Sequence, residues 1–240
     1  MISLIELRKK FTISVIIPAH NEEEHIEDVI KTVQKRKEID EIIVVNDGST
    51  DKTADVAKRC NVKVISTSEN YGKGHAMKLG ASKAIGDILL FLDADIKNMD
   101  SKKIEDLIDP FKDMYDFVKT RFDRNAGRVT LLTAKPLLEH LFPEIAQRFE
   151  QPLSGQIGIK KELLDKMNLE DDYGVDIGIL IDAVEMGAKT KEVYFGYLEH
   201  DERALEDLDV TARQVTRVIL DKASKYNRQS DTGLIQSEIA

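Results

Sequence analysis

The chain has 240 residues, of which 42% are hydrophobic and 33% are charged, and its formal net charge is −9. At roughly 100–200 residues per domain, we expect one large domain, and the acidic balance argues against nucleic acid as a partner because such binding needs clustered Lys and Arg. No apolar run approaches the roughly 20 residues that span a bilayer, and Cys60 is the only cysteine, so we expect a cytoplasmic protein with no integral membrane segment.

The first 95 residues alternate between strand-like and helix-like patterns. The apolar run at 14–19 predicts a strand buried on both faces. Asn21 is expected to cap the next helix, where four apolar residues between Ile26 and Val33 form one stripe. Further strands are predicted over 41–46, 62–67 and 87–93, and further helices over 52–59 and 73–85. This alternation predicts a mainly parallel sheet with right-handed crossovers.

The second half of the chain is less regular. Strands are predicted over 116–121, 155–159 and 190–198. Helices are predicted over 104–111, 130–141, 160–166, 176–186 and 207–226, and a polar loop over 123–128. No Pro- or Gly-rich linker separates the halves, so residues 1–226 are expected to form one domain, followed by a polar tail at 227–240.

The Asp93-Ala94-Asp95 motif follows a strongly apolar predicted strand. Ligands bind at the carboxyl ends of strands in open α/β sheets. Two carboxylates one residue apart can hold a divalent cation such as Mg²⁺ or Mn²⁺, which prefers oxygen ligands. The alternative is that both carboxylates cap the segment that follows.

Two further turns also carry polar chemistry. The oxygens of Asp47 and Ser49 can accept hydrogen bonds from a nucleobase or ribose, although Ser49 or Thr50 can equally serve as a helix N-cap. Glycines surround Lys73 at a predicted helix start, which suits the approach of a phosphate. The pattern is neither a Walker P-loop nor the dinucleotide fingerprint.

These turns, together with Pro18–Glu22, follow successive strands and are expected to meet at one edge of the sheet. As a set, SVIIPAHNEE, EIIVVNDGSTDKT, ENYGKGHAMKLG and GDILLFLDAD resemble the nucleotide-sugar-binding half of GT-A-fold glycosyltransferases, over about 13–97. The stretches FVKTRFDRNAGRVTLLTAKPLLEHLFPE, QPLSGQ, YGVDIGILIDA and LEHDER resemble the glucosyl-3-phosphoglycerate synthase family. The resemblance implies a GT-A-type, Rossmann-like α/β fold with a mixed, mainly parallel sheet flanked by helices, and an acceptor-binding half over 98–226.

The resemblance also implies roles for individual residues. Catalytic roles fall to Lys73, Asp93, Asp95 and Asp176, and the metal ligands are Asp95 and His200. The donor nucleotide-sugar is contacted by Pro18, Ala19, His20, Asn21, Glu22, Asp47, Lys73, Asp93, Ala94, Tyr173 and Asp176, with Val175 beside the sugar. The acceptor is held by Gly127, Arg128, Val129 and Thr130. His20, Leu198 and Asp176 depart from the family pattern, which leaves the identities of sugar and acceptor open.

The implied reaction moves glucose from UDP-, GDP- or ADP-glucose to the 2-hydroxyl of 3-phosphoglycerate, with retention and with Mg²⁺ or Mn²⁺. Mannosyl-3-phosphoglycerate synthase, glucosylglycerate synthase, which uses glycerate, and polyprenyl-phosphate glycosyltransferase activities are the nearest alternatives. A sugar-phosphate nucleotidyltransferase and a non-enzymatic nucleotide-sugar sensor are more distant ones. The long predicted helix 207–226 can pack in a homodimer.

Overall fold

The computed structural model describes residues 11–123, 127–199 and 205–228. Its strands are β1 (Ile13–Ala19), β2 (Glu41–Asn46), β3 (Lys63–Ser66), β4 (Ile88–Phe91), β5 (Phe117–Asp123), β6 (Ile157–Lys160) and β7 (Thr190–Tyr197). Its helices are α1 (Ile26–Gln34), α2 (Thr53–Arg59), α3 (Lys73–Lys83), α4 (Ser101–Lys112), the π-helix η1 (Thr130–Ala134), α5 (Lys135–Leu141), α6 (Pro143–Arg148), α7 (Lys161–Leu164), α8 (Val175–Glu185) and α9 (Leu205–Lys225).

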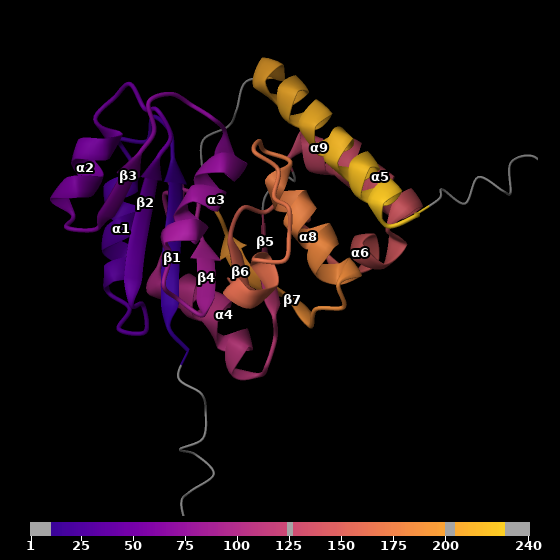
Figure 1. Cartoon of the computed structure of the whole chain (residues 1–240), viewed down its shortest axis with the longest axis horizontal. Coiled ribbons are helices and arrows are strands. Elements are labelled where there is room, and N and C mark those ends of the chain that lie inside the picture. The colour runs from indigo at the N-terminus through magenta and orange to yellow at the C-terminus, as the bar shows by residue number, and fades with distance from the viewer. Residues whose placement is uncertain (1–10, 124–126, 200–204, 229–240) are drawn as a thin grey trace, which may run out of the picture.

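Within the described ranges, seven strands form one sheet in the order β3-β2-β1-β4-β6-β5-β7. β6 runs antiparallel to both of its neighbours, and the other strand pairs are parallel. β4, β5 and β7 therefore share one direction with β1 and β2, so the carboxyl ends of six strands lie on the same edge. This arrangement confirms the predicted mixed, mainly parallel α/β fold (Figure 1).

Both faces of the sheet are buried, as the continuous apolar run of β1 predicts. Val15 and Ile17 belong to a core shared with α1, α2 and α4. Ile16, between them, belongs to a second core shared with α3, α5, α8 and α9. A Cβ on Gly80 of α3 would lie 2.4 Å from a methyl carbon of Ile16, so this glycine lets α3 pack closely on β1.

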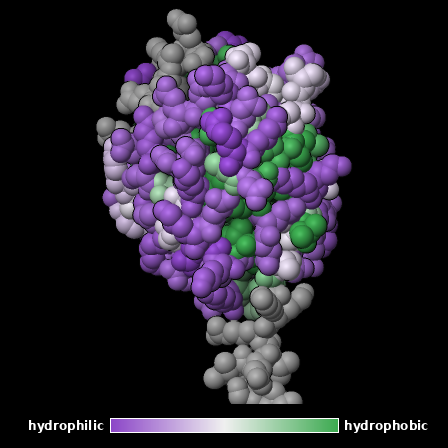
Figure 2. Space-filling model, turned by 90° about the vertical axis from the view of Figure 1, so that its left-hand side faces the viewer, coloured by the Kyte–Doolittle hydropathy of each residue, from purple (hydrophilic) through white to green (hydrophobic). Residues whose placement is uncertain are grey.

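The edge strand β3 is short and polar at both ends. Its first and last residues, Lys63 and Ser66, are exposed. Figure 2 looks onto the side of the molecule that carries α2 and β3, and hydrophilic residues cover most of it around a smaller hydrophobic area. A short edge strand with a charged residue discourages pairing with strands of other chains. Among the described helices, none is both long and apolar enough to cross a bilayer.

The structure differs from the sequence analysis at three places. Asn21 does not cap the first helix, because α1 begins only at Ile26, after His25. The sequence analysis assigned no element to the segment that forms α6 (Pro143–Arg148). The helix predicted over 130–141 begins as the π-helix η1 and becomes α-helical at Lys135, next to Pro136. Proline has no N–H and its ring displaces the carbonyl one turn earlier, which explains a change of helical form there.

Candidate active site

A pocket opens at the shared carboxyl edge of the sheet. Nine of the thirteen residues that line it were predicted from the sequence as donor contacts, and Asp95 as a metal ligand. The lining residues are Pro18, Ala19, His20, Glu22, Asp47, Asn70, Gly72, Lys73, Ala76, Asp93, Ala94, Asp95 and Tyr173. They come from the ends of β1, β2 and β4, from the start of α3 and from the loop before α8, so segments distant in sequence meet here as the motif order predicted.

Asn21, although predicted as a donor contact, joins the loops that follow β1 and β2 and does not line this pocket. Its backbone adopts φ = 57°, a left-handed conformation that asparagine tolerates better than most residues. The Asn21 side-chain oxygen accepts a hydrogen bond from Thr50 N–H at 2.8 Å, and Asn21 N–H donates to the Ser49 hydroxyl at 3.0 Å. Neither Ser49 nor Thr50 caps α2 as expected, because its N-cap is Lys52, which makes no side-chain cap hydrogen bond. Asp51 accepts a hydrogen bond from Thr53 N–H.

The Asp47 carboxylate, which is 3% exposed, holds the loop that leads to Lys73. It accepts hydrogen bonds from the backbone N–H groups of Tyr71 and Gly72, the latter at 2.8 Å, and from the Thr67 hydroxyl at 3.0 Å. Gly72 adopts φ = 104°, a conformation that favours glycine. Asp47 therefore fixes the approach of this loop to the pocket, whatever it contributes to nucleotide binding.

Lys73 connects acidic residues from the two halves of the chain. Its ammonium lies 2.7 Å from an oxygen of Asp93, after β4, and 2.8 Å from an oxygen of Asp176, in the first turn of α8. Burial acts to lower the pKa of Lys73, but the two carboxylates outweigh burial and raise that pKa above its usual value. Lys73 is therefore a permanent cation at the pocket wall.

The segment before β6 packs against Asp93 and holds its carboxylate. The Gln156 amide donates to Asp93 at 2.8 Å. A Cβ on Gly155 would lie 2.2 Å from an Asp93 carboxylate oxygen and 2.5 Å from the Lys73 nitrogen, so any side chain at this position would displace the ion pair. Sequence reasoning used QPLSGQ only as part of the resemblance and assigned these two residues no role.

Asp176 is a buried carboxylate of which only one oxygen is hydrogen-bonded. The residue is 5% exposed, and its second carboxylate oxygen has no hydrogen-bond partner among the described residues. An unpaired buried oxygen costs free energy. Asp176, although predicted as a donor contact, does not line the pocket and is connected to it through its ion pair with Lys73. Val175, predicted to lie beside the sugar, is fully buried in the core.

Asp95 is the predicted metal ligand that the structure places in the pocket wall. His200 lies outside the described residues. Glu199, the residue before it, is held beside the Asp95 segment, since Lys97 N–H donates to its carbonyl and its own N–H donates to Asn98, both at 3.0 Å. No cluster of three metal-binding side chains exists among the described residues. A carboxylate completed by phosphate oxygens nevertheless suits Mg²⁺ or Mn²⁺.

The predicted acceptor residues follow β5, on the same edge of the sheet. Arg128 is exposed, whereas Val129 and Thr130 are buried, and the Gly127 carbonyl accepts from Leu131 N–H at 3.2 Å. None of the four lines the pocket described above. They form a separate group after β5, and their role stays a prediction.

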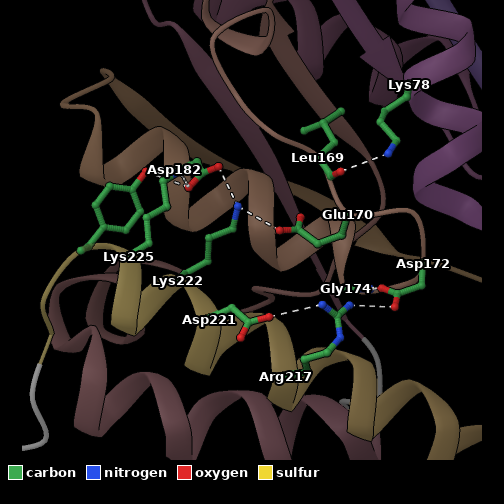
Figure 3. Close-up of polar contacts among 11 residues, drawn as sticks. Lys78, Leu169, Glu170, Asp172, Gly174, Asp182, Arg217, Asp221, Lys222 and Lys225 are labelled. Carbon is green, nitrogen blue, oxygen red and sulfur yellow. Dashed lines mark hydrogen bonds and ion pairs between the residues drawn. The ribbon is translucent and has the colours of Figure 1, made fainter.

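The loop 169–174, which carries Tyr173, is held between α3 and α9 (Figure 3). On the α3 side, the Leu169 carbonyl accepts from Lys78 at 3.2 Å. On the α9 side, Asp172 pairs with Arg217 at 2.8 Å, and Glu170 pairs with Lys222 at 2.9 Å. The position of Tyr173 at the pocket thus depends on ion pairs that sequence reasoning did not foresee.

Comparisons with known proteins identify the family of this chain. The family model described as glycosyl transferase family 2 matches residues 14–161. Glucosyl-3-phosphoglycerate synthases from Mycobacterium tuberculosis and Petrotoga mobilis are 34% and 32% identical to this chain, covering 88% and 94% of it and 73% and 78% of their own lengths. A crystal structure of the Mycobacterium tuberculosis enzyme with Mn²⁺, UDP and glucosyl-3-phosphoglycerate matches with a TM-score of 0.85 at 34% identity, covering 92% of this chain and 84% of that one. The chain is therefore a glycosyltransferase that belongs to glycosyl transferase family 2 and is a homologue of the glucosyl-3-phosphoglycerate synthases.

Proposed function

We propose that this enzyme transfers glucose from a nucleotide-diphosphate glucose, with UDP-glucose as the first candidate, to the 2-hydroxyl of 3-phosphoglycerate. The observation that carries the proposal is the placement of Lys73 between Asp93 and Asp176 at the wall of the pocket. This arrangement joins the nucleotide-binding edge of the sheet to α8. The complex of the Mycobacterium tuberculosis relative with Mn²⁺, UDP and glucosyl-3-phosphoglycerate supports the same substrate pair.

Lys73 supplies the positive charge that the departing nucleoside diphosphate needs. An ammonium has three donors, and two of them face Asp93 and Asp176. The third is available to a phosphate oxygen, where negative charge grows as the sugar–phosphate bond breaks. A divalent cation held by Asp95 and His200 supplies, when bound, further charge stabilisation for the diphosphate.

Asp176 and Asp93 orient the sugar in this proposal. The unpaired carboxylate oxygen of Asp176 accepts a glucose hydroxyl, and Asp93 lies on the ribose or sugar side of the donor. Arg128 and Thr130 then bind the acceptor phosphate or carboxylate and place its 2-hydroxyl for attack, so they act by positioning and not by proton transfer.

Retention of configuration is part of the proposal. The reacting sugar carbon gains oxocarbenium character as the donor bond breaks. The acceptor hydroxyl attacks from the face that the diphosphate leaves, and the leaving phosphate oxygen takes the acceptor proton. Proton NMR of the glucoside tests this, because an α-linked product is expected and a β-linked product would rule out same-face attack.

The substrate assignment is tested by a matrix of nucleotide-sugars and acceptors. UDP-, GDP- and ADP-glucose, with the matching mannose donors, are incubated with 3-phosphoglycerate and glycerate, with and without Mg²⁺ or Mn²⁺. Release of nucleoside diphosphate is expected to be fastest with a glucose donor and 3-phosphoglycerate plus metal. Faster turnover with mannose donors or glycerate would reassign the substrate. Release of inorganic diphosphate, or donor binding without turnover, would reject the glycosyltransferase reaction.

We further propose a cytoplasmic homodimer. The single cysteine, Cys60, suits a reducing compartment. Val210 and Leu220 on α9 are 55% and 49% exposed, which supports this helix as a contact between two copies. Light scattering coupled to size-exclusion chromatography is expected to give twice the 27.1 kDa chain mass, and a mass of one chain at micromolar concentration would contradict the dimer.

A further inference from the structure

Lys119, in the middle of β5, is a fully buried lysine next to the proposed active site. Its relative exposure is 0%, and it lies between strands β6 and β7. Lysine is almost never fully buried unless its charge is compensated. The Lys119 ammonium donates to two backbone carbonyls, that of Ser154 at 2.7 Å and that of Asp176 at 3.1 Å. Among the described residues, no carboxylate oxygen forms an ion pair with the Lys119 ammonium, so its role is unlike that of Lys73.

The two carbonyls belong to the two segments that position Asp93 and Asp176, the acids paired with Lys73. Asp176 is itself the acid in the first turn of α8. Ser154 precedes Gly155 and Gln156, and these two residues contact Asp93. The Ser154 hydroxyl also donates to the side-chain amide oxygen of Gln156 at 3.1 Å. This hydrogen bond orients the side-chain amide nitrogen of Gln156 toward Asp93. One buried ammonium therefore ties together the supports of both acids that hold Lys73.

Charged groups surround Lys119 from four elements. Asp176 of α8, Asp93 after β4 and Glu192 of β7 favour its positive charge, whereas Lys73 of α3 opposes that charge. Burial dominates and lowers the pKa of Lys119 to about 8. Burial raises the pKa of Asp176, and the nearby ammonium groups of Lys73 and Lys119 oppose that rise. The charge state of Lys119 is thus linked to that of the open Asp176 carboxylate.

We propose that Lys119 is a positioning residue for glucosyl transfer, which fixes the Asp176 carboxylate relative to Asp93 and Lys73 without touching either substrate. The inference rests on the proposed function, because it assigns Asp176 to the sugar. A displacement of about 1 Å in an active site can cost on the order of 100-fold in rate. The donor nucleotide contacts other residues of the pocket, so the loss is expected in kcat and not in nucleotide affinity.

The test compares K119M with a matched control, K191M. Lys191 lies on β7 beside Val118 but is exposed, so the same chemical change is made outside the site. K119M is expected to reduce kcat about 10- to 100-fold, with the Kd for UDP, measured by calorimetry with Mg²⁺, within about threefold of the original protein. K191M is expected to leave both values unchanged. A folded K119M with kcat within about twofold of the original enzyme would overturn the proposal, as would parallel loss of kcat and UDP affinity.

A second measurement covers the case in which K119M does not fold. The kcat of the unmodified enzyme is expected to fall as pH rises through about 8, and K119R, which keeps its charge at that pH, is expected to lack this decline. A kcat that stays flat to pH 9.5, or an identical decline in K119R, would overturn the proposal. Failure of the proposed function is recognised separately, because the unmodified enzyme would then show no turnover with 3-phosphoglycerate at any pH.

Discussion

Lys222 offers a direct test of how α9 is held to the rest of the molecule. Its ammonium lies 2.7 Å from Asp182 of α8 and 2.9 Å from Glu170, and the side chains of Lys222, Asp182 and Glu170 are 6%, 0% and 14% exposed. The variant K222M keeps the length of the side chain but removes its charge. Asp182 would then remain buried with fewer partners, namely Lys225 at 2.9 Å and the Tyr226 hydroxyl at 2.8 Å.

The expected cost follows from this geometry. Breaking a buried ion pair by removing one partner costs about 3–5 kcal/mol. Since Lys225 and Tyr226 still hold Asp182, the lower end applies, and we expect K222M to reduce the free energy of unfolding by about 3 kcal/mol. For a chain of this size, about 2–4 °C is lost per kcal/mol, so the melting temperature should fall by roughly 6–12 °C.

The assay is urea denaturation followed by circular dichroism, with a thermal scan alongside. The control is R213A, which removes an exposed pair on the same helix, with Arg213 and Asp209 3.0 Å apart and 78% and 62% exposed. Exposed pairs of this spacing contribute about 0.3–0.5 kcal/mol. If K222M destabilises the protein no more than R213A does, the buried cluster contributes nothing measurable to stability, and our account of how α9 is held is wrong.

Four further predictions concern the site. D95A should abolish Mg²⁺- or Mn²⁺-dependent turnover with little change in melting temperature, and an unchanged kcat would remove Asp95 from the metal. R128A should raise the KM for 3-phosphoglycerate far more than that for the nucleotide-sugar, whereas equal increases would make Arg128 structural. G155A places a methyl group against Asp93, 2.2 Å from its carboxylate oxygen, so steady-state kinetics should show kcat reduced about 100-fold, and a normal kcat would show that the loop yields. The pKa of Lys119 in the folded protein is about 8, below its usual 10.5, so between these pH values the unfolded chain binds more protons than the folded one. Urea unfolding at pH 8 and pH 10 should therefore show that the stability of the original protein relative to K119M rises with pH. A stability difference that stays constant would refute the lowered pKa.

The donor half of the site was predictable because its signals are local. Continuous apolar runs identify the buried strands, and each polar turn stands directly after one of them. Parallel strands then bring those turns to one edge, whatever the details of packing. Asp93, Asp95 and Lys73 were located by this reasoning alone. The family comparison confirms the overall reaction class that the resemblance implied.

Other features depend on distant parts of the chain and leave no local signal. The role of Asp47 is one, because nothing near it in sequence shows that its partners are the N–H groups of Tyr71 and Gly72. Lys119 is another. A lysine between Val118 and Thr120 is typical of a strand with one exposed face. Lys119 is buried because its ammonium lies against the segment before β6 and the first turn of α8, where it donates to the Ser154 and Asp176 carbonyls.

The insertion of β6 between β4 and β5 has a consequence for how such enzymes can be recombined. β4 is the last strand of the nucleotide-binding half, yet its neighbour in the sheet is the antiparallel β6, which comes almost seventy residues later in the sequence. β5 precedes β6 in the sequence but lies farther from β4 in the sheet. A break near residue 97 would therefore strip β4 of its hydrogen-bonded neighbour and uncover Phe91 and Leu89 of the core. Chimeras that exchange acceptor specificity between homologues should accordingly carry β6 with the donor portion, or replace everything from β5 to β7 as one block.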